Sequence, residues 1–352
     1  MLFLSRRLQP LRICKDDTLL EFFPQELTII EVVQIIVIFV ARQILAVLGR
    51  ETKFEVGKTA DNDIEYVLPE LRLSMPMRIA ERDLRKYATA VGQTDYKEIF
   101  QRHEQLCLIL SAFSEPAFLL LLAHHRSPVR PVGSVNVKNR FELLRFDMCS
   151  MERMLDRVGY EARARMVPVA RRVKRGLEID LEVEVVDVEE DVVIFRQVFT
   201  TLQFMRFKRG VDQSRASDLS ASQDSWPDDC PSKSFSIARE LTMMWAYVCK
   251  DYNPIHSSRL AAKVLGFPDR LLHGNHAFAW ALQAIPSSAE HEVKEVKSSV
   301  LVVEVQFKRP IVGSSKLVAE AYQAENGDSW LIRVCKAGDS KVYITGSRKR
   351  LE

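Results

Sequence analysis

The most informative segment of the chain spans residues 246–282 and reads AYVCKDYNPIHSSRLAAKVLGFPDRLLHGNHAFAWAL. Within it, Asp251, Asn253, Pro254 and His256 form the pattern D-x-N-P-x-H. An Asn-Pro pair favours a turn, because proline fixes its own φ and restricts the residue before it. A carboxylate and an imidazole on one rigid loop can hold a water between them. Asp251 and His256 are therefore candidates for acid–base chemistry on water.

His273 and Gly274 stand where an apolar stretch, residues 274–285, begins. This stretch contains no further glycine and no proline, and it predicts a buried helix. At the start of a helix, the N–H of Gly274 would suit a developing oxyanion. Alternatively, the glycine only permits close packing there. For His273 we expect a structural hydrogen bond rather than a chemical role.

The motifs DYNPIH (251–256), AAKVLGFP (261–268) and LLHG (271–274) resemble the hydratase motif of the MaoC-like dehydratases, also called (R)-specific enoyl-CoA hydratases or hydratase 2. The run VQFKRP (305–310) is similar to the next strand of that family. The resemblance covers residues 236–351. The first half is similar only to the non-catalytic partner in double-hotdog members, through its element order.

This resemblance implies an α+β double hotdog: two antiparallel sheets, each wrapped around a long central helix, with an N-terminal helical extension. It assigns catalysis to Asp251 and His256, with Asn253, His273 and Gly274 supporting them. The implied reaction is reversible hydration of a trans-2-enoyl thioester to an (R)-3-hydroxyacyl thioester in fatty-acid metabolism. Coenzyme A or acyl carrier protein would carry the acyl group, with no metal and no other cofactor.

Two positions depart from the family pattern. Members commonly have Ser-Gly immediately before the catalytic aspartate, whereas this chain has Cys249-Lys250. The comparable stretch of the first half, residues 87–100, has Asp95 but no Asn-Pro, and the next histidine is His103. We therefore expect one active site per chain, in the second half.

Hydrophobic periodicity predicts a similar order of elements in both halves, with a helix followed by strands. Between them, residues 210–234 are rich in Ser and Asp, which is typical of a linker or insertion. The predicted domains are an extension (1–72), a degenerate hotdog (73–209), this linker, and a catalytic hotdog (235–352). The predicted helices are 104–124, 236–250 and 274–285, and the predicted strands are 134–146, 176–186, 191–205, 300–307, 316–323, 330–336 and 341–347, with a turn at 325–328.

The N-terminus is basic and has no acidic residue before Asp16, a bias shared by transit peptides. Residues 27–48 are long enough to cross a bilayer, but Glu31, Gln34, Arg42 and Gln43 interrupt them. We expect an amphipathic helix that packs on the next domain and makes peripheral contact with a membrane. A membrane anchor is the alternative.

The composition limits which classes of partner are expected. The chain is 47% hydrophobic and 28% charged, with a formal net charge of +3, so nothing favours a nucleic-acid partner. Its six cysteines are scattered without C-x-x-C pairs, which indicates free thiols and an intracellular location, cytoplasmic or mitochondrial. The expected partner is an acyl thioester, and a homodimer remains open.

Two other functions stay open from the sequence. One is a non-catalytic acyl-thioester-binding or membrane-associated subunit. The other is a hotdog thioesterase, which would usually carry a water-activating carboxylate on its central helix. Residues 274–285 contain no carboxylate.

Overall fold

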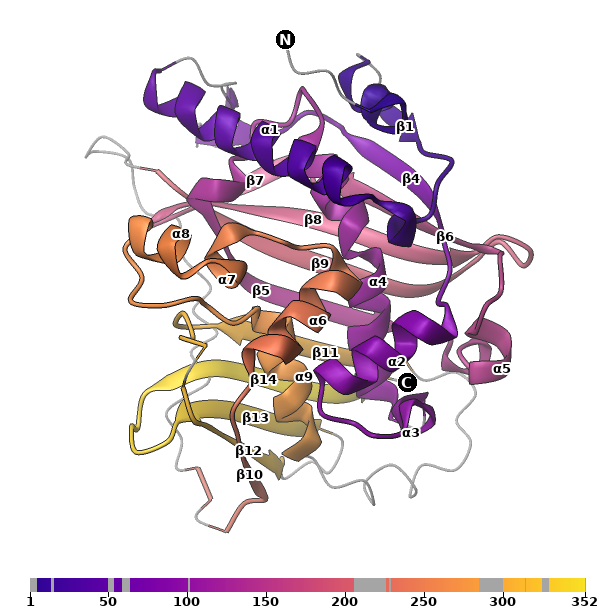
Figure 1. Cartoon of the computed structure of the whole chain (residues 1–352), viewed down its shortest axis with the longest axis vertical. Helices are drawn as coiled ribbons and strands as arrows, with labels where there is room; N and C mark the ends of the chain where they lie inside the picture. The colour runs from indigo at the N-terminus through magenta and orange to yellow at the C-terminus, as the bar shows by residue number, and fades with distance from the viewer. Residues whose placement is uncertain are drawn as a thin grey trace.

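The protein is built around one continuous sheet with its helices packed on it (Figure 1). The computed structural model describes residues 5–13, 16–49, 54–58, 64–100, 102–205, 226–227, 229–284, 300–313, 315–324 and 329–351. Among these residues, 14 strands join in one sheet, whose main path runs β1-β4-β6-β8-β9-β5-β11-β14-β13-β12-β10. Strands of the first half of the chain occupy one end of this path and strands of the second half the other.

The strands of the first half wrap around α4 (His103–Ala123), which matches the predicted helix 104–124. Nearly every side chain of α4 is buried, because its apolar residues cover the whole helix circumference. The strands alternate buried and accessible residues, so one face meets the helix. They are β4 (Arg72–Met77), β5 (Ser134–Leu143), β6 (Tyr160–Met166), β7 (Val169–Val173), β8 (Gly176–Asp187) and β9 (Val192–Phe204).

The second half repeats this plan around a shorter helix, α9 (Gly274–Ala281), which continues as the 3-10 turn η5 (Leu282–Ala284). The four predicted strands are present at nearly the predicted positions. They are β11 (Val300–Phe307), β12 (Leu317–Gln323), β13 (Ser329–Lys336) and β14 (Val342–Leu351). The predicted turn 325–328 and Ile285 lie outside the described residues.

The two halves join where β5 pairs antiparallel with β11, from Leu301↔Leu143 to Gln306↔Lys138. Buried side chains also cross this seam. Asn139 on β5 donates to Asn275 on α9 at 2.6 Å, and Gln105 on α4 donates to the carbonyl of Ala279 at 2.8 Å. The halves therefore share one core rather than touching as separate domains.

The N-terminal segment contributes strands to the same sheet and is not a separate extension. β1 (Asp17–Leu19) pairs parallel with β4, while β2 (Glu55–Lys58) pairs with β3 (Ile64–Val67), which in turn pairs with β7. The helix predicted within residues 27–48 is present as α1 (Ile29–Val47). A capping box between Thr28 and Glu31 fixes its start.

The structure also shortens the predicted linker 210–234. β10 (Ser232–Phe235) pairs with β12 at the edge of the sheet, so the last residues of the predicted linker belong to the sheet of the second half. Residues 210–225 lie outside the described part of the chain.

Short helices complete the fold, and two of them frame the loops of interest. α2 (Glu81–Ala90) and α6 (Arg239–Cys249) pack against each other, each just before the loop of its own half. The rings of Tyr87 and Trp245 meet between them, 5.5 Å apart. The remaining helices are η1 (Arg6–Arg12), η2 (Pro24–Glu26), α3 (Tyr96–Phe100), η3 (Pro131–Gly133), η4 (Phe146–Met148), α5 (Met151–Met154), α7 (Pro254–Ser257) and α8 (Arg259–Val264).

Candidate active site

The loop that follows α6 is shaped by local hydrogen bonds. The Asp251 carboxylate accepts from the backbone N–H of Asn253 at 3.0 Å. The Asn253 side chain then caps α7 by accepting from the N–H of Ile255, and Pro254 takes the first helical position, where no N–H is needed. Asp251, Asn253 and Pro254 thus fix the shape of the loop. His256 lies within α7, three residues after Asn253.

His256 is oriented by a carbonyl on a different segment. Its Nδ1 lies 2.9 Å from the carbonyl oxygen of Leu271, which requires a proton on Nδ1. Nε2 of the neutral ring then carries the lone pair and faces Asp251 Oδ2 at 3.9 Å. That separation is too long for a hydrogen bond, but one water could contact both atoms at about 2.8 Å. The arrangement suits a base that acts on water.

His273 sits between the two candidates and holds the aspartate. Its Nε2 is 3.1 Å from the backbone carbonyl of Asp251 and 3.5 Å from Oδ2 of the same residue. Its ring stacks on His256, with the centroids 3.8 Å apart. Among the described residues, these three side chains also form the one cluster with metal-binding composition. Because Nε2 of His273 hydrogen-bonds to the protein, its geometry is that of the expected structural histidine.

Gly274 begins α9, so its N–H has no acceptor within the helix. A Cβ at this position would lie 2.6 Å from the ring of Phe307 on β11. The glycine therefore lets the helix start pack directly on the aromatic ring. This packing and the expected oxyanion contact can both hold, because one concerns the α-carbon and the other the backbone N–H.

Ionisation states follow from burial and from these contacts. Burial alone would raise the pKa of Asp251, but the hydrogen bond from His273 and the nearby imidazoles lower that pKa to about 2. Burial, with a further effect from His273, lowers the pKa of His256 to about 4. At neutral pH the loop thus presents an ionised carboxylate beside a neutral imidazole. Their side chains keep 20% and 14% of their surface exposed, so water can reach both.

Lys250, the unexpected neighbour of Asp251, is turned away from the site. It ends α6 in the left-handed conformation, with φ 57° and ψ 11°. Glycine adopts that conformation at no steric cost, which gives a physical reason for the glycine that the family resemblance leads us to expect here. The Lys250 amine lies 4.4 Å from the ring centroid of Tyr247. Burial lowers the pKa of this amine, and the charge of Asp83 opposes that effect.

Sequence reasoning missed one carboxyl group, that of Glu115 on α4. Burial and the charge of Asp251 raise its pKa well above the usual range, and a hydrogen bond with the side chain of Cys249 opposes this. The raised pKa favours the protonated form of Glu115, which α4 brings to the loop from the other half of the chain. The sequence did mark Glu115 as unusual, because it is the single acidic residue of this apolar helix after the first turn.

The corresponding loop of the first half does not assemble a similar pair. Asp95 accepts from the N–H of Lys97, and His103 accepts a contact from Arg350 at 3.2 Å while its ring packs on Phe146. Within the described residues, no hydrogen bond or ion pair joins Asp95 to His103. One active site per chain therefore stays a prediction.

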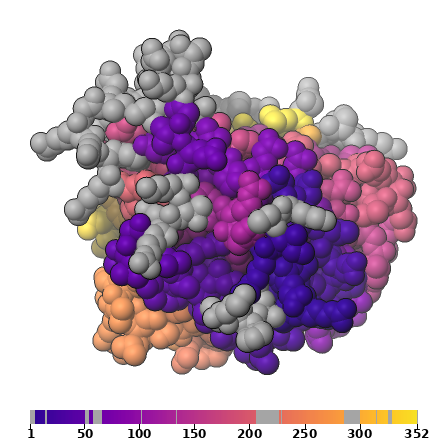
Figure 2. Space-filling view, turned by 90° about the horizontal axis from the view of Figure 1, so that it is seen from above, coloured from indigo at the N-terminus to yellow at the C-terminus, as the bar shows by residue number. Residues whose placement is uncertain are grey.

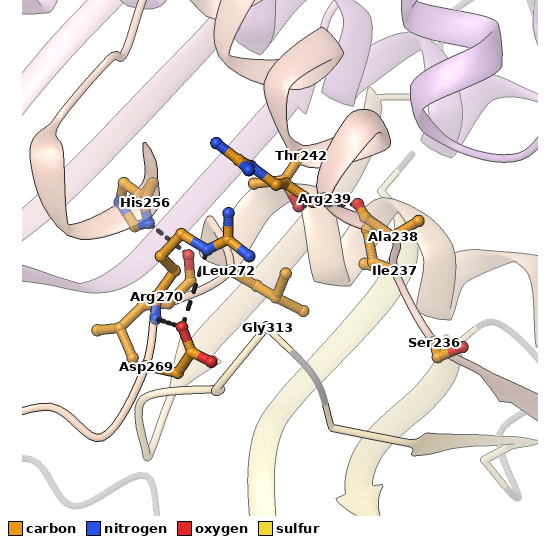
Figure 3. Close-up of a pocket in the computed structure, with 11 residues that line it drawn as sticks. Ser236, Ile237, Ala238, Arg239, Thr242, His256, Asp269, Arg270, Leu272 and Gly313 are labelled. Carbon is orange, nitrogen blue, oxygen red and sulfur yellow. Dashed lines mark hydrogen bonds and ion pairs between the residues drawn. The ribbon is translucent and has the colours of Figure 1, made fainter. Parts of the chain in front are cut away.

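A pocket opens beside His256, with a cavity volume of about 350 Å³ (Figure 3). Two arginines contribute to its wall: Arg239 at the start of α6, and Arg270 in the segment that precedes α9. Asp269 accepts from the backbone N–H of Arg270 at 2.7 Å and lies 3.8 Å from its guanidinium. Apolar walls come from Ile237 and Leu272. The pocket therefore combines an imidazole, two guanidinium groups, the carboxylate of Asp269 and an apolar surface.

Comparisons with known proteins agree with this fold. Residues 228–340 match the family model described as the MaoC like domain. The 3-hydroxyacyl-thioester dehydratase X of Mycobacterium tuberculosis is 26% identical over 240 residues, which cover 68% of this chain and 77% of that protein. The crystal structure of HtdX from the same organism superposes with a TM-score of 0.56 at 20% identity, over 80% of this chain and 100% of that one.

A MaoC-like dehydratase from Phytophthora capsici gives a TM-score of 0.57 at 15% identity, over 81% of this chain and 96% of that one. The chain therefore has the α+β hotdog fold of these solved structures, and residues 228–340 are similar to the MaoC like domain. Both the resemblance found in the sequence and the predicted fold class are confirmed.

Proposed function

We propose that the protein is a hydro-lyase that interconverts a trans-2-enoyl thioester and an (R)-3-hydroxyacyl thioester. The MaoC-like domain and the 26% identical 3-hydroxyacyl-thioester dehydratase support a hydratase or dehydratase role. The observation that carries the proposal is the pairing of an ionised Asp251 with a neutral His256 whose Nε2 is 3.9 Å from the carboxylate. No metal or redox cofactor enters this mechanism.

In the hydration direction, Asp251 and His256 orient one water, and the Nε2 lone pair of His256 takes its proton as the water oxygen bonds to the β-carbon. The electron pair of the carbon–carbon double bond moves onto the thioester oxygen, which the N–H of Gly274 stabilises. The enolate then collapses as the α-carbon takes a proton from the Asp251–His256 pair, which returns to its starting protonation state, so that one water has been added. Dehydration follows the same steps in reverse.

The pocket beside His256 supports a carrier that bears phosphate. Coenzyme A and acyl carrier protein both present the thioester on a pantetheine arm with phosphate at its far end. Arg239 and Arg270 supply positive charge within the pocket, and Ile237 and Leu272 supply apolar surface. The acyl group would extend in the other direction, toward the core that the two halves share.

A thioesterase is the second candidate, because Glu115 puts a carboxyl on the central helix of the first half, beside the loop. Its raised pKa argues against this role, since the shift favours the protonated form, which cannot take a proton from water. The two candidates give different products. Hydration removes the conjugated double bond and keeps the thioester, whereas hydrolysis releases a free thiol.

The test is to mix purified full-length protein with crotonyl-CoA and longer enoyl thioesters on both carriers. We expect loss of the absorbance of the conjugated thioester without thiol release, and at least a hundredfold drop in kcat for Asp251→Asn and for His256→Ala. Asp95→Asn, in the corresponding loop of the first half, is the matched control and should retain wild-type activity. Wild-type protein that is inert toward every enoyl thioester would refute the proposal.

A further inference from the structure

Helix α1 is strongly apolar and yet lies on the outside of the protein. Two described helices, α1 and α4, are long and apolar enough to cross a membrane. In α4, 89% of the most apolar stretch is buried, as expected for a core helix. In α1, only 22% of the corresponding stretch is buried. Figure 2 looks onto the face of the molecule over which the N-terminal segment, in indigo, is spread. A soluble protein rarely leaves a continuous apolar surface of this kind uncovered.

Six of the eight exposed side chains of α1 recur at alternating intervals of three and four, so they form one stripe along the helix, and the other two, Ile29 and Leu45, are also aliphatic. The exposed fractions at its two ends are 71% for Ile30 and 78% for Val47. Every member is aliphatic. The stripe consists of Ile30, Val33, Val37, Val40, Ile44 and Val47.

Both charged residues of α1 are used on the inner side of the helix. Glu31 is buried and accepts from Thr28 and from the hydroxyl of Ser5. Arg42 donates to three carbonyl groups at the end of α4, those of residues 122–124, and burial lowers its pKa to about 10. Their internal partners leave the outer face without charge, and the inner residues Val32, Ile35 and Phe39 attach α1 to the core.

We propose that the outer face of α1 lies in the interfacial region of a lipid membrane, with the helix parallel to the surface. A bilayer accepts a smooth aliphatic stripe without a shaped counterpart. A protein partner would more typically meet aromatic or arginine anchors, and the stripe contains none. The neighbouring segment has complementary charge: the first 15 residues contain four basic residues and no acid, and Arg6 and Arg7 on η1 are exposed. Spanning the bilayer would instead strip Glu31 and Arg42 of their partners.

The test is flotation of the full-length protein with phosphatidylcholine vesicles containing phosphatidylserine. The test variant, Val33→Asp with Val40→Asp, places two charges on the stripe; Val and Asp have similar helix propensities, so the helix itself should persist. The matched control, Val158→Asp with Val188→Asp, makes the same change at exposed valines in loops outside α1. Hydration activity and the unfolding temperature are measured for all three proteins.

We expect wild-type protein and the control to float with the vesicles, and the Val33/Val40 variant to lose at least about tenfold in partitioning while remaining folded and active. Absence of wild-type flotation, or equal flotation of both variants, would overturn the proposal. Light scattering without lipid provides a second check. A wild-type dimer that the Val33/Val40 variant alone converts to monomer would assign the stripe to a second copy of the chain instead.

Discussion

At the scale of single residues, the ionisation of His256 determines how activity should depend on pH. Its pKa is lowered to about 4, and only the neutral ring can accept a proton from water. We therefore expect kcat/KM for hydration to stay constant through the mildly acidic range and to fall tenfold per pH unit below about pH 4. Stopped-flow assays, which outrun acid unfolding, measure this. A decline that begins at the ordinary histidine pKa would contradict the assignment.

Glu115 should affect stability in the opposite sense to an ordinary surface carboxylate. Its pKa in the folded state is raised above the value of 4.5 taken as normal, so the stability it contributes is complete below that value and is lost as pH rises through the folded pKa. Glu115→Gln cannot ionise. Its unfolding temperature, relative to wild type, should therefore increase as pH rises from acid to neutral.

The exposed Glu98 on α3 offers a control for this measurement. Glu98→Gln reports what the same change does at an exposed position, so only the pH dependence beyond that of Glu98→Gln is assigned to Glu115. If Glu115→Gln and Glu98→Gln show the same pH dependence, the pKa of Glu115 is not raised by burial and by Asp251.

Lys250 permits a clean test of backbone strain. Its left-handed conformation disfavours any residue with a Cβ, by about 1 kcal/mol. Lys250→Gly and Lys250→Ala both remove the amine from Tyr247, so the difference between them isolates the effect of φ. Urea denaturation should show the glycine variant to be more stable than the alanine variant by about that amount. Equal stabilities would mean that the loop relaxes out of the left-handed region.

The sequence predicted the residues of the site that one loop brings together, and it missed those that arrive from elsewhere. Asp251, Asn253 and His256 are linked by hydrogen bonds within a few residues, so their spacing alone defines their geometry. Glu115 reaches the loop from another half of the chain, and the carbonyl of Leu271 orients His256 across a gap of 15 residues. Local sequence does not show which partners these two contacts join, although the isolation of Glu115 in an apolar helix marks it as unusual.

At the scale of secondary-structure elements, the start of α9 depends on how closely it approaches β11. Because a Cβ on Gly274 would overlap the ring of Phe307, Gly274→Ala should destabilise the fold by about 1–3 kcal/mol and lower activity. Phe307→Leu in the same chain should restore most of the stability. The double variant, assayed for kcat, separates the two roles of the glycine: recovered activity supports an N–H that still reaches the thioester oxygen, whereas continued inactivity indicates that the backbone has moved.

Long periodic elements were predicted and short or polar ones were not. The helices near 104–124 and 236–250 and the four strands of the second half stand out because their apolar residues repeat along several turns or pleats. β10 and β1 are only 4 and 3 residues long, so tertiary pairing rather than local preference determines them. That is why the predicted boundaries at residues 72 and 234 fall within or beside strands of the sheet.

At the scale of the whole molecule, buried polar contacts make the two halves one cooperative unit. Asn139→Leu would remove the donor to Asn275 and leave a buried carbonyl without its partner, at a cost of about 1–3 kcal/mol. We expect denaturation monitored by fluorescence and by circular dichroism to give one coincident transition, shifted to lower urea in this variant. Two separate transitions would show instead that the halves unfold independently.

Because the two halves that pair through β5 and β11 belong to one chain, they should also respond to dilution differently from two separate chains. A site built between two separate hotdog chains would be lost as the protein concentration fell below their dissociation constant. Here the two halves remain at a high effective concentration for each other whatever the concentration of the chain. Specific activity should therefore be independent of enzyme concentration in solution, and titration with a tight inhibitor should find one site for every 40.4 kDa of protein.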